Sequence, residues 1–108
     1  MEIDIKEFAK LDMRVGTVLS VNEIPGADKL LRLTVDTGDE KPRQLVAGIK
    51  QTHKAEELVG HQIVVVCNLK PAVLKGVRSE GMLLAADAED GPVLLVPDKP
   101  VQTGTRIR

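Results

Sequence analysis

The sequence predicts an all-β fold, a five-stranded Greek-key barrel with one short helix between its third and fourth strands. Three observations support this prediction. Apolar and polar residues alternate over residues 12–24 and 29–37, a near-continuous apolar run covers 61–68, and a helical segment at 52–60 separates that run from the earlier strands. Three strands, a helix and two further strands follow the order of an OB-fold.

The first two elements precede and open the barrel. Asp4 and Glu7 are spaced as in a capping box, which predicts a short N-terminal helix of one or two turns. In residues 12–24, every second residue faces one side of a long strand: Met13, Val15, Thr17, Leu19 and Val21. Gly16 predicts a bulge or sharp bend within it. Such a bend suits a first strand that serves both halves of the barrel.

A turn at residues 25–28 leads to the second strand, 29–37, in which Leu31, Leu33 and Val35 share a face. Residues 38–42, GDEKP, predict a hairpin turn, and RQLVAGI at 43–49 is the third strand.

The helix between strands three and four is predicted from its ends. Thr52 is a candidate N-cap, and Gly60 is a candidate for the residue that follows the C-cap. The following run, HQIVVVCN at 61–68, is apolar enough for a strand that is buried on both faces.

The last third of the chain contains the fifth strand, MLLAAD at 82–87, and a shorter strand at 92–97. The tail, KPVQTGTRIR, forms a small C-terminal extension. The segment NLKPAVLKGVRSEGMLLAA, residues 68–86, lies between two apolar runs, and we expect it to hold an irregular basic stretch without side chains suited to catalysis.

Length and composition limit the class of protein. The 108 residues predict a single domain, 1–108. The single cysteine, Cys67, excludes an internal disulfide and a cysteine-based zinc site. No apolar run approaches the roughly 20 residues that span a bilayer, and the acidic N-terminus does not resemble a secretion signal. We therefore expect a soluble, cytoplasmic protein with no membrane partner.

The charge distribution favours a nucleic-acid partner over a catalytic role. Residues 41–78 hold seven cations and two anions, a net charge of +5, whereas the remaining residues sum to −6. The alternative to a nucleic-acid site is a solvated surface with scattered charges. Phe8 is the single aromatic residue, so base stacking is a poor explanation, and cations on phosphates with recognition by shape are favoured.

No catalytic, cofactor or metal site is expected. His53 and His61 lie outside any recognisable catalytic motif, and a buried, inert thiol is the favoured interpretation of Cys67. The paired acids at 39–40 and 89–90 lie in predicted turns, where solvated charge is the ordinary state. The chain is therefore expected to be a non-catalytic binding domain.

Four segments together carry a family resemblance: DMRVG, ADKLLRL, LVAGI and, most specifically, NLKPAVLKGVRSEGMLLAA. They resemble the OB-type tRNA-binding domain found at the C-terminus of many methionyl-tRNA synthetases, as a split subunit, and as free-standing tRNA-binding proteins. The resemblance covers about residues 5 to 108. It implies a homodimer that binds the outer corner of the L-shaped tRNA without reading an anticodon, and that adds tRNA affinity to a synthetase in cis or in trans.

The resemblance implies a set of contact residues in this chain. Cations would pair with phosphates, Asn and Ser would hydrogen-bond to backbone or ribose, and Met would offer a flexible apolar contact. The candidates are Lys29, Arg32, Asn68, Lys70, Lys75, Arg78, Ser79 and Met82.

Several of these residues have plainer roles. Asn68 could simply end strand four, and Met82 could face the core. Gly76 and Gly81 are expected to serve the backbone conformation, and Arg14 is expected to form an internal ion pair rather than contact RNA.

Two other functions are compatible with this sequence. A CsaA-like export chaperone that binds unfolded polypeptides is related in sequence to the same domain. An oligosaccharide-binding or purely structural barrel would show no salt-dependent RNA affinity. Apolar surface at 72–74 and 92–97 gives modest support to a homodimer.

Overall fold

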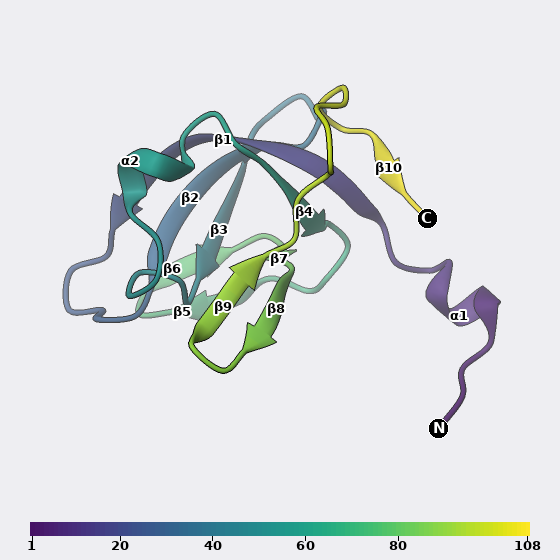
Figure 1. The fold of residues 1–108 in the computed structure, drawn as a ribbon, viewed down its shortest axis with the longest axis horizontal. Helices are drawn as coiled ribbons and strands as arrows, with labels where there is room; N and C mark the ends of the chain where they lie inside the picture. The colour runs from purple at the N-terminus through teal and green to yellow at the C-terminus, as the bar shows by residue number, and fades with distance from the viewer.

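A computed structural model describes all residues, 1–108. Its elements, in chain order, are α1 (Ile5–Phe8), β1 (Met13–Glu23), β2 (Leu31–Asp36), β3 (Arg43–Ala47), α2 (Ala55–Leu58), β4 (Gln62–Val66), β5 (Ala72–Leu74), β6 (Val77–Ser79), β7 (Met82–Leu83), β8 (Ala85–Ala88), β9 (Gly91–Leu94) and β10 (Arg106–Ile107) (Figure 1). No helix is long and apolar enough to cross a membrane.

Five strands form a nearly closed antiparallel barrel in the order β3-β2-β1-β4-β7. The long strand β1 pairs with β2 through its second half and with β4 through its first half, so it serves both sides of the barrel as predicted. The helix α2 lies between β3 and β4 in the chain. The predicted OB-type barrel is therefore confirmed.

The core is aliphatic, as expected for a chain with one aromatic residue. On β2, Leu31, Leu33 and Val35 are each no more than 2% exposed, which confirms the predicted alternation. They pack with Leu45 of β3 and Ile63 of β4 in one cluster of eleven buried residues.

The prediction that every second residue of β1 faces the same side is wrong at the centre of the strand. The register against β2 shifts between Val18 and Ser20, so Val18 is buried and Leu19 is 47% exposed. Gly16 itself pairs regularly with Ile63. It is needed for close approach instead, because a Cβ there would lie 2.6 Å from Val35 Cγ1.

The caps of the two short helices differ from the prediction. Asp4 is the N-cap of α1, but its side chain makes no capping hydrogen bond. Lys54, not Thr52, is the N-cap of α2, and the Thr52 hydroxyl donates to the Ile49 carbonyl instead. Gly60 follows the C-cap with a φ of +86°, as predicted.

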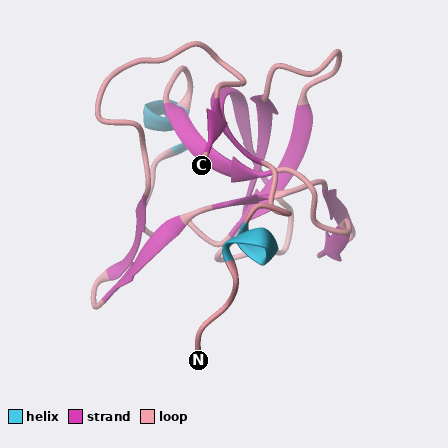
Figure 2. Ribbon diagram, turned by 90° about the vertical axis from the view of Figure 1, so that its right-hand side faces the viewer, coloured by secondary structure: helices cyan, strands magenta, loops and turns pink.

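The predicted fifth strand is divided. β7 pairs with β4 and belongs to the barrel, whereas β8 leaves it and forms a hairpin with β9. A second hairpin, β5–β6, precedes β7. The two hairpins project from opposite sides of the barrel, with β8–β9 in front and β5–β6 behind in Figure 1, and at the left and right in Figure 2.

Candidate RNA-binding surface

The stretch predicted to be irregular contains a regular β-hairpin, which corrects that expectation. β5 and β6 pair with Leu74 opposite Val77, which leaves a two-residue turn of Lys75 and Gly76. Both turn residues have positive φ, +50° and +77°, as in a type I′ turn. The turn places the Lys75 side chain at the exposed tip of the hairpin.

The base of this hairpin is attached to the free edge of β3. The amide of Glu80 donates to the Gln44 carbonyl at 2.8 Å, and the Gln44 amide donates to Glu80 Oε1 at 3.1 Å. The Gln44 side chain also donates to the Arg78 carbonyl at 2.8 Å. These bonds close the barrel between β3 and β7 and fix the position of the hairpin.

Ser79, one of the predicted contact residues, takes part in this closure. It is 5% exposed, and its hydroxyl accepts a hydrogen bond from the Val46 amide at 3.0 Å and donates to the Gly81 carbonyl at 2.9 Å. This hydroxyl is engaged within the domain, which favours a structural role over an RNA contact.

A second, smaller apolar cluster joins the hairpin to the β1–β2 connection. Ile24 and Ala27 from that connection are buried with Val46 of β3, and Val77 of β6 packs against them. Two predicted contact residues flank this cluster: Lys29 lies in the connection, and Arg32 on β2 is opposite Val46. Arg32 is thus paired with the β3 residue of this cluster, and Lys29 lies two residues from Ala27 in the connection.

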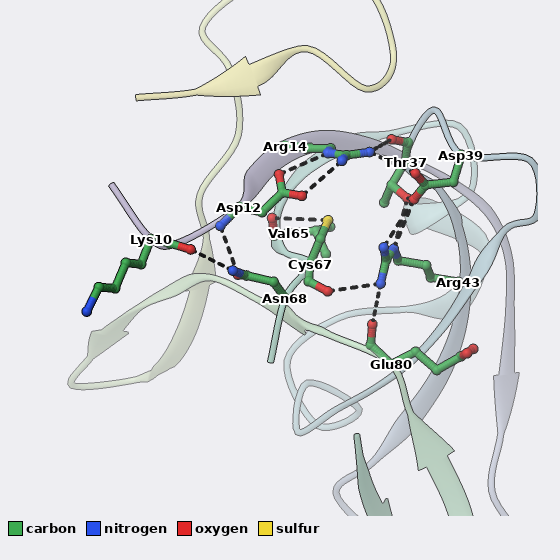
Figure 3. Close-up of polar contacts among 10 residues, drawn as sticks. All are labelled: Lys10, Asp12, Arg14, Thr37, Asp39, Arg43, Val65, Cys67, Asn68 and Glu80. Carbon is green, nitrogen blue, oxygen red and sulfur yellow. Dashed lines mark hydrogen bonds and ion pairs between the residues drawn. The ribbon is translucent and has the colours of Figure 1, made fainter. Parts of the chain in front are cut away.

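Asn68 lies at the other end of the segment and links it to the N-terminal residues. Its Nδ2 donates to the Lys10 carbonyl at 2.6 Å, and its Oδ1 accepts from the Asp12 amide at 2.8 Å (Figure 3). Both side-chain groups are therefore in use, as expected for a residue that ends strand four.

The remaining candidates are exposed. Lys70, Lys75 and Arg78 lie on the surface, and Met82 is 48% exposed at the start of β7, so Met82 is not a core residue. None of the cationic candidates forms an ion pair: Lys29, Arg32, Lys70, Lys75 and Arg78.

The sequence also contains cations that the structure uses internally. Arg14 bonds to both carboxylate oxygens of Asp12, at 2.9 and 3.0 Å, and to Asp39 at 2.9 Å, which confirms the predicted ion pair. Lys50 pairs with Glu23 at 2.9 Å. Arg43 pairs with Asp39. The unpaired positive charge of residues 41–78 is therefore reduced. The cations that remain without an ion pair include those on the hairpin.

Sequence reasoning counted Arg43 only as a charge and missed its contacts. Its Nη1 donates to the carbonyls of Cys67 and Glu80, both at 3.0 Å, and its Nε donates to Thr37 Oγ1 and Asp39 Oδ2, both at 3.2 Å (Figure 3). Asp39 is four residues from Arg43, but no local signal indicates the contacts with Cys67 and Glu80, which lie 24 and 37 residues away in the chain.

The polar cluster around Asp39 affects its protonation. The hydrogen bond from the Thr37 hydroxyl, followed by the guanidinium groups of Arg14 and Arg43, holds the pKa of Asp39 below its usual value. The hydrogen bonds that Arg14 donates to Asp12 and, in second place, to Asp39 raise the pKa of Arg14. Burial raises the pKa of the Cys67 thiol, so it is a poor nucleophile. No three His, Cys, Asp or Glu side chains lie close enough together to hold a metal ion.

Comparison with known proteins identifies the family of the chain. Residues 13–106 match the family described as "Putative tRNA binding domain". The chain is 55% identical over 106 residues to a methionine–tRNA ligase of Thermococcus kodakarensis and 53% identical over 108 residues to that of Methanocaldococcus jannaschii. These matches cover 98% and 99% of this chain but only 14% and 16% of the two ligases.

Two solved structures are similar over their whole length. A MetRS-related protein from Pyrococcus horikoshii has a TM-score of 0.91 and 40% identity, and each chain covers 100% of the other. The chaperone CsaA from Bacillus anthracis has a TM-score of 0.89 and 33% identity, again with complete coverage of both chains.

Proposed function

Because this chain belongs to the tRNA-binding domain family, we propose that it is a non-catalytic module that binds tRNA by shape and phosphate backbone. In this role it adds tRNA affinity to methionyl-tRNA synthetase, in cis or in trans, and a cytoplasmic location follows from these partners. The chain spans about one sixth or less of the length of the ligases that it matches. This favours an accessory tRNA-binding role beside a separate catalytic part.

One observation carries this proposal: the cations on and beside the β5–β6 hairpin are free. Lys70, Lys75 and Arg78 form no ion pair within the domain. Lys29 and Arg32, also without an ion pair, lie next to residues of the small apolar cluster against which Val77 of the hairpin packs. Unpaired surface cations can neutralise phosphates and release counterions without first losing an internal partner.

The residues around these cations favour recognition by shape. Phe8, the single aromatic residue, is on α1, which lies outside the barrel and apart from β5 and β6 in Figure 1, so no aromatic side chain is available for base stacking on this surface. Met82 is the exposed apolar residue that could contact a sugar or base face. The outer corner of the tRNA, which presents phosphates and riboses in a fixed arrangement, is the proposed target.

We further propose a homodimer that uses the β8–β9 side. Val93, Leu95 and Val96 expose 44–55% of their surface there. The same hairpin carries Asp87, Glu89 and Asp90, which form no ion pair and would repel a phosphate backbone. Assigning the acidic hairpin to the dimer leaves the basic hairpin of each subunit free for RNA.

The dimer is tested by sedimentation of the wild-type chain and of Val93→Asp. We expect the substitution to shift the chain from dimer to monomer. A matched substitution on the opposite hairpin, Val73→Asp, should leave the dimer intact. A wild-type chain that sediments as a monomer at all concentrations would refute the assignment.

The binding function is tested by filter binding of several unrelated tRNAs over a salt series. We expect similar affinities among the tRNAs, weak binding of linear single strands, and a log–log salt slope that is negative. Lys75→Ala and Arg78→Ala should weaken binding with little change in thermal stability. If they unfold the domain, the hairpin is structural and the proposed contact set is wrong.

The similarity to CsaA over the full chain supports a second candidate, a chaperone for unfolded polypeptides. β5 pairs only with β6, and its three residues are all exposed, so its other edge could pair with an extended peptide. Competition separates the two functions. An unfolded polypeptide that displaces tRNA only weakly favours the tRNA-binding role, whereas preferential binding of the polypeptide favours the chaperone.

A further inference from the structure

The segment that carries the β5–β6 hairpin leaves the barrel after Cys67 and returns to it at Glu80. One nitrogen of Arg43 holds both of these points, because Nη1 donates to the Cys67 carbonyl and to the Glu80 carbonyl at 3.0 Å each (Figure 3). The two ends of the hairpin segment, Cys67 and Glu80, are thus bonded to one side chain, that of the first residue of β3.

The rest of the Arg43 side chain is fixed from the other side. Nε lies 3.2 Å from Thr37 Oγ1 and from Asp39 Oδ2, and Nη2 lies 3.2 Å from the same Asp39 oxygen. Asp39 is held in turn by Arg14, which bonds to it at 2.9 Å. The guanidinium therefore spans the β2–β3 connection and the two ends of the hairpin segment.

We infer that Arg43 is a positioning residue for tRNA binding: it sets the orientation of the β5–β6 hairpin without touching the RNA. This inference rests on the proposed function. Its charge is already neutralised by Asp39, and its donors point to partners within the domain. The hairpin, by contrast, presents Lys75 and Arg78 to solvent.

The geometry needs arginine rather than any cation. A guanidinium presents its donors in a rigid planar fork, so it can bond to two carbonyls on one side and a carboxylate on the other. A lysine ammonium is a compact point charge on a flexible stem and cannot reach all these acceptors at once. Arg43→Lys therefore keeps the charge and removes the clamp.

The test compares Arg43→Lys with a matched control, Arg14→Lys. Arg14 belongs to the same polar cluster and bonds to Asp39, but it contacts neither Cys67 nor Glu80. Two readouts are measured well below the melting temperature: the Kd for tRNA over a salt series, and amide hydrogen exchange. The amides of Gln44, Val46 and Glu80 report the docking of the hairpin on β3.

We expect Arg43→Lys to speed exchange at these three amides about tenfold while the β1–β2 amides are unchanged. If the binding-competent orientation falls to about a tenth of the population, the Kd rises about tenfold. The salt slope should change less than it does in Lys75→Ala, because no phosphate contact is removed. In Arg14→Lys, Asp39 keeps its bonds to Thr37 and Arg43, so this control should change neither the hairpin exchange nor the Kd by more than about twofold.

The outcomes separate the inference from the function on which it rests. If the wild-type chain binds tRNA and Arg43→Lys binds equally well, the positioning role is wrong and the proposed function stands. If the wild-type chain binds no tRNA, both are wrong.

A second variant covers the case in which Arg43→Lys does not fold. Asp39→Asn keeps Arg43 and weakens the group that orients it, so it should speed the hairpin exchange and raise the Kd in the same direction by a smaller factor. Unchanged exchange and affinity in this variant would also overturn the inference.

Discussion

Lys75 occupies a backbone conformation that its side chain disfavours, and this makes stability and binding separable at one position. Its φ is +50°, and with Gly76 at +77° it forms a two-residue turn in which Asn-Gly is the preferred pair. A residue with a Cβ in this left-handed region loses about 1 kcal/mol or more, whereas Asn tolerates it through local hydrogen bonds. Lys75→Asn should therefore stabilise the domain by about 0.5–1 kcal/mol.

For a domain of about this size, 1 kcal/mol corresponds to about 4–8 °C in the melting temperature. We expect Lys75→Asn to melt about 4 °C above the wild-type chain in a thermal scan followed by circular dichroism. Lys75→Ala keeps a Cβ at positive φ, so its melting temperature should stay within about 2 °C of the wild type.

The two substitutions remove the same charge, so their effects on tRNA binding should agree. Loss of one exposed phosphate contact of about 1 kcal/mol raises the Kd about fivefold and lowers the steepness of the log–log salt plot by about 0.9. A more stable, more weakly binding Asn variant is the expected result. Lower stability in Lys75→Asn would refute the account of the turn, and unchanged binding in both variants would refute the role of Lys75.

Three further outcomes follow from close contacts within the domain. Ser79→Ala leaves the buried Val46 amide without its partner and should lower the free energy of unfolding by about 1–3 kcal/mol in urea titrations. Gly16→Ala places a Cβ 2.6 Å from Val35 Cγ1 and should cost about 1–3 kcal/mol, measured the same way; an unchanged midpoint would show that β1 can shift. The folded-state pKa of Asp39 is lowered, so its contribution is present above the unfolded value of about 3.9 and is lost as the pH falls through the folded value. Stability measured from pH 7 to pH 2.5 should therefore fall less steeply in Asp39→Asn than in the wild type.

The sequence predicted those parts of the fold that depend on neighbouring residues. The alternation of Leu31, Leu33 and Val35 identified β2 and its buried face, and Gly60 marked the end of α2. The bulge in β1 was placed at Gly16 because glycine is the usual signal. The actual shift follows Val18, where no residue type marks it.

The local structure of the candidate surface was predicted less well, and the reason is again distance along the chain. The β5–β6 hairpin has strands of three residues and a Lys-Gly turn, which give weak local signals. Ser79 and Asn68 are candidate RNA contacts by residue type, and their partners within the domain, Val46 and Lys10, are 33 and 58 residues away. Only the closed barrel shows that these polar groups are already bonded.

The pairing of β1 has a consequence for how the domain is made. Besides β2 and β4, β1 pairs with β10, with Met13 opposite Ile107. During synthesis on the ribosome, β1 therefore cannot pair with β10 until residue 107 has been synthesised and has left the exit tunnel. Until then its edge is open to pairing with other chains, and such long-range pairing is slow to form. Co-translational folding of this domain is thus expected to reach its last step only when almost the whole segment has emerged.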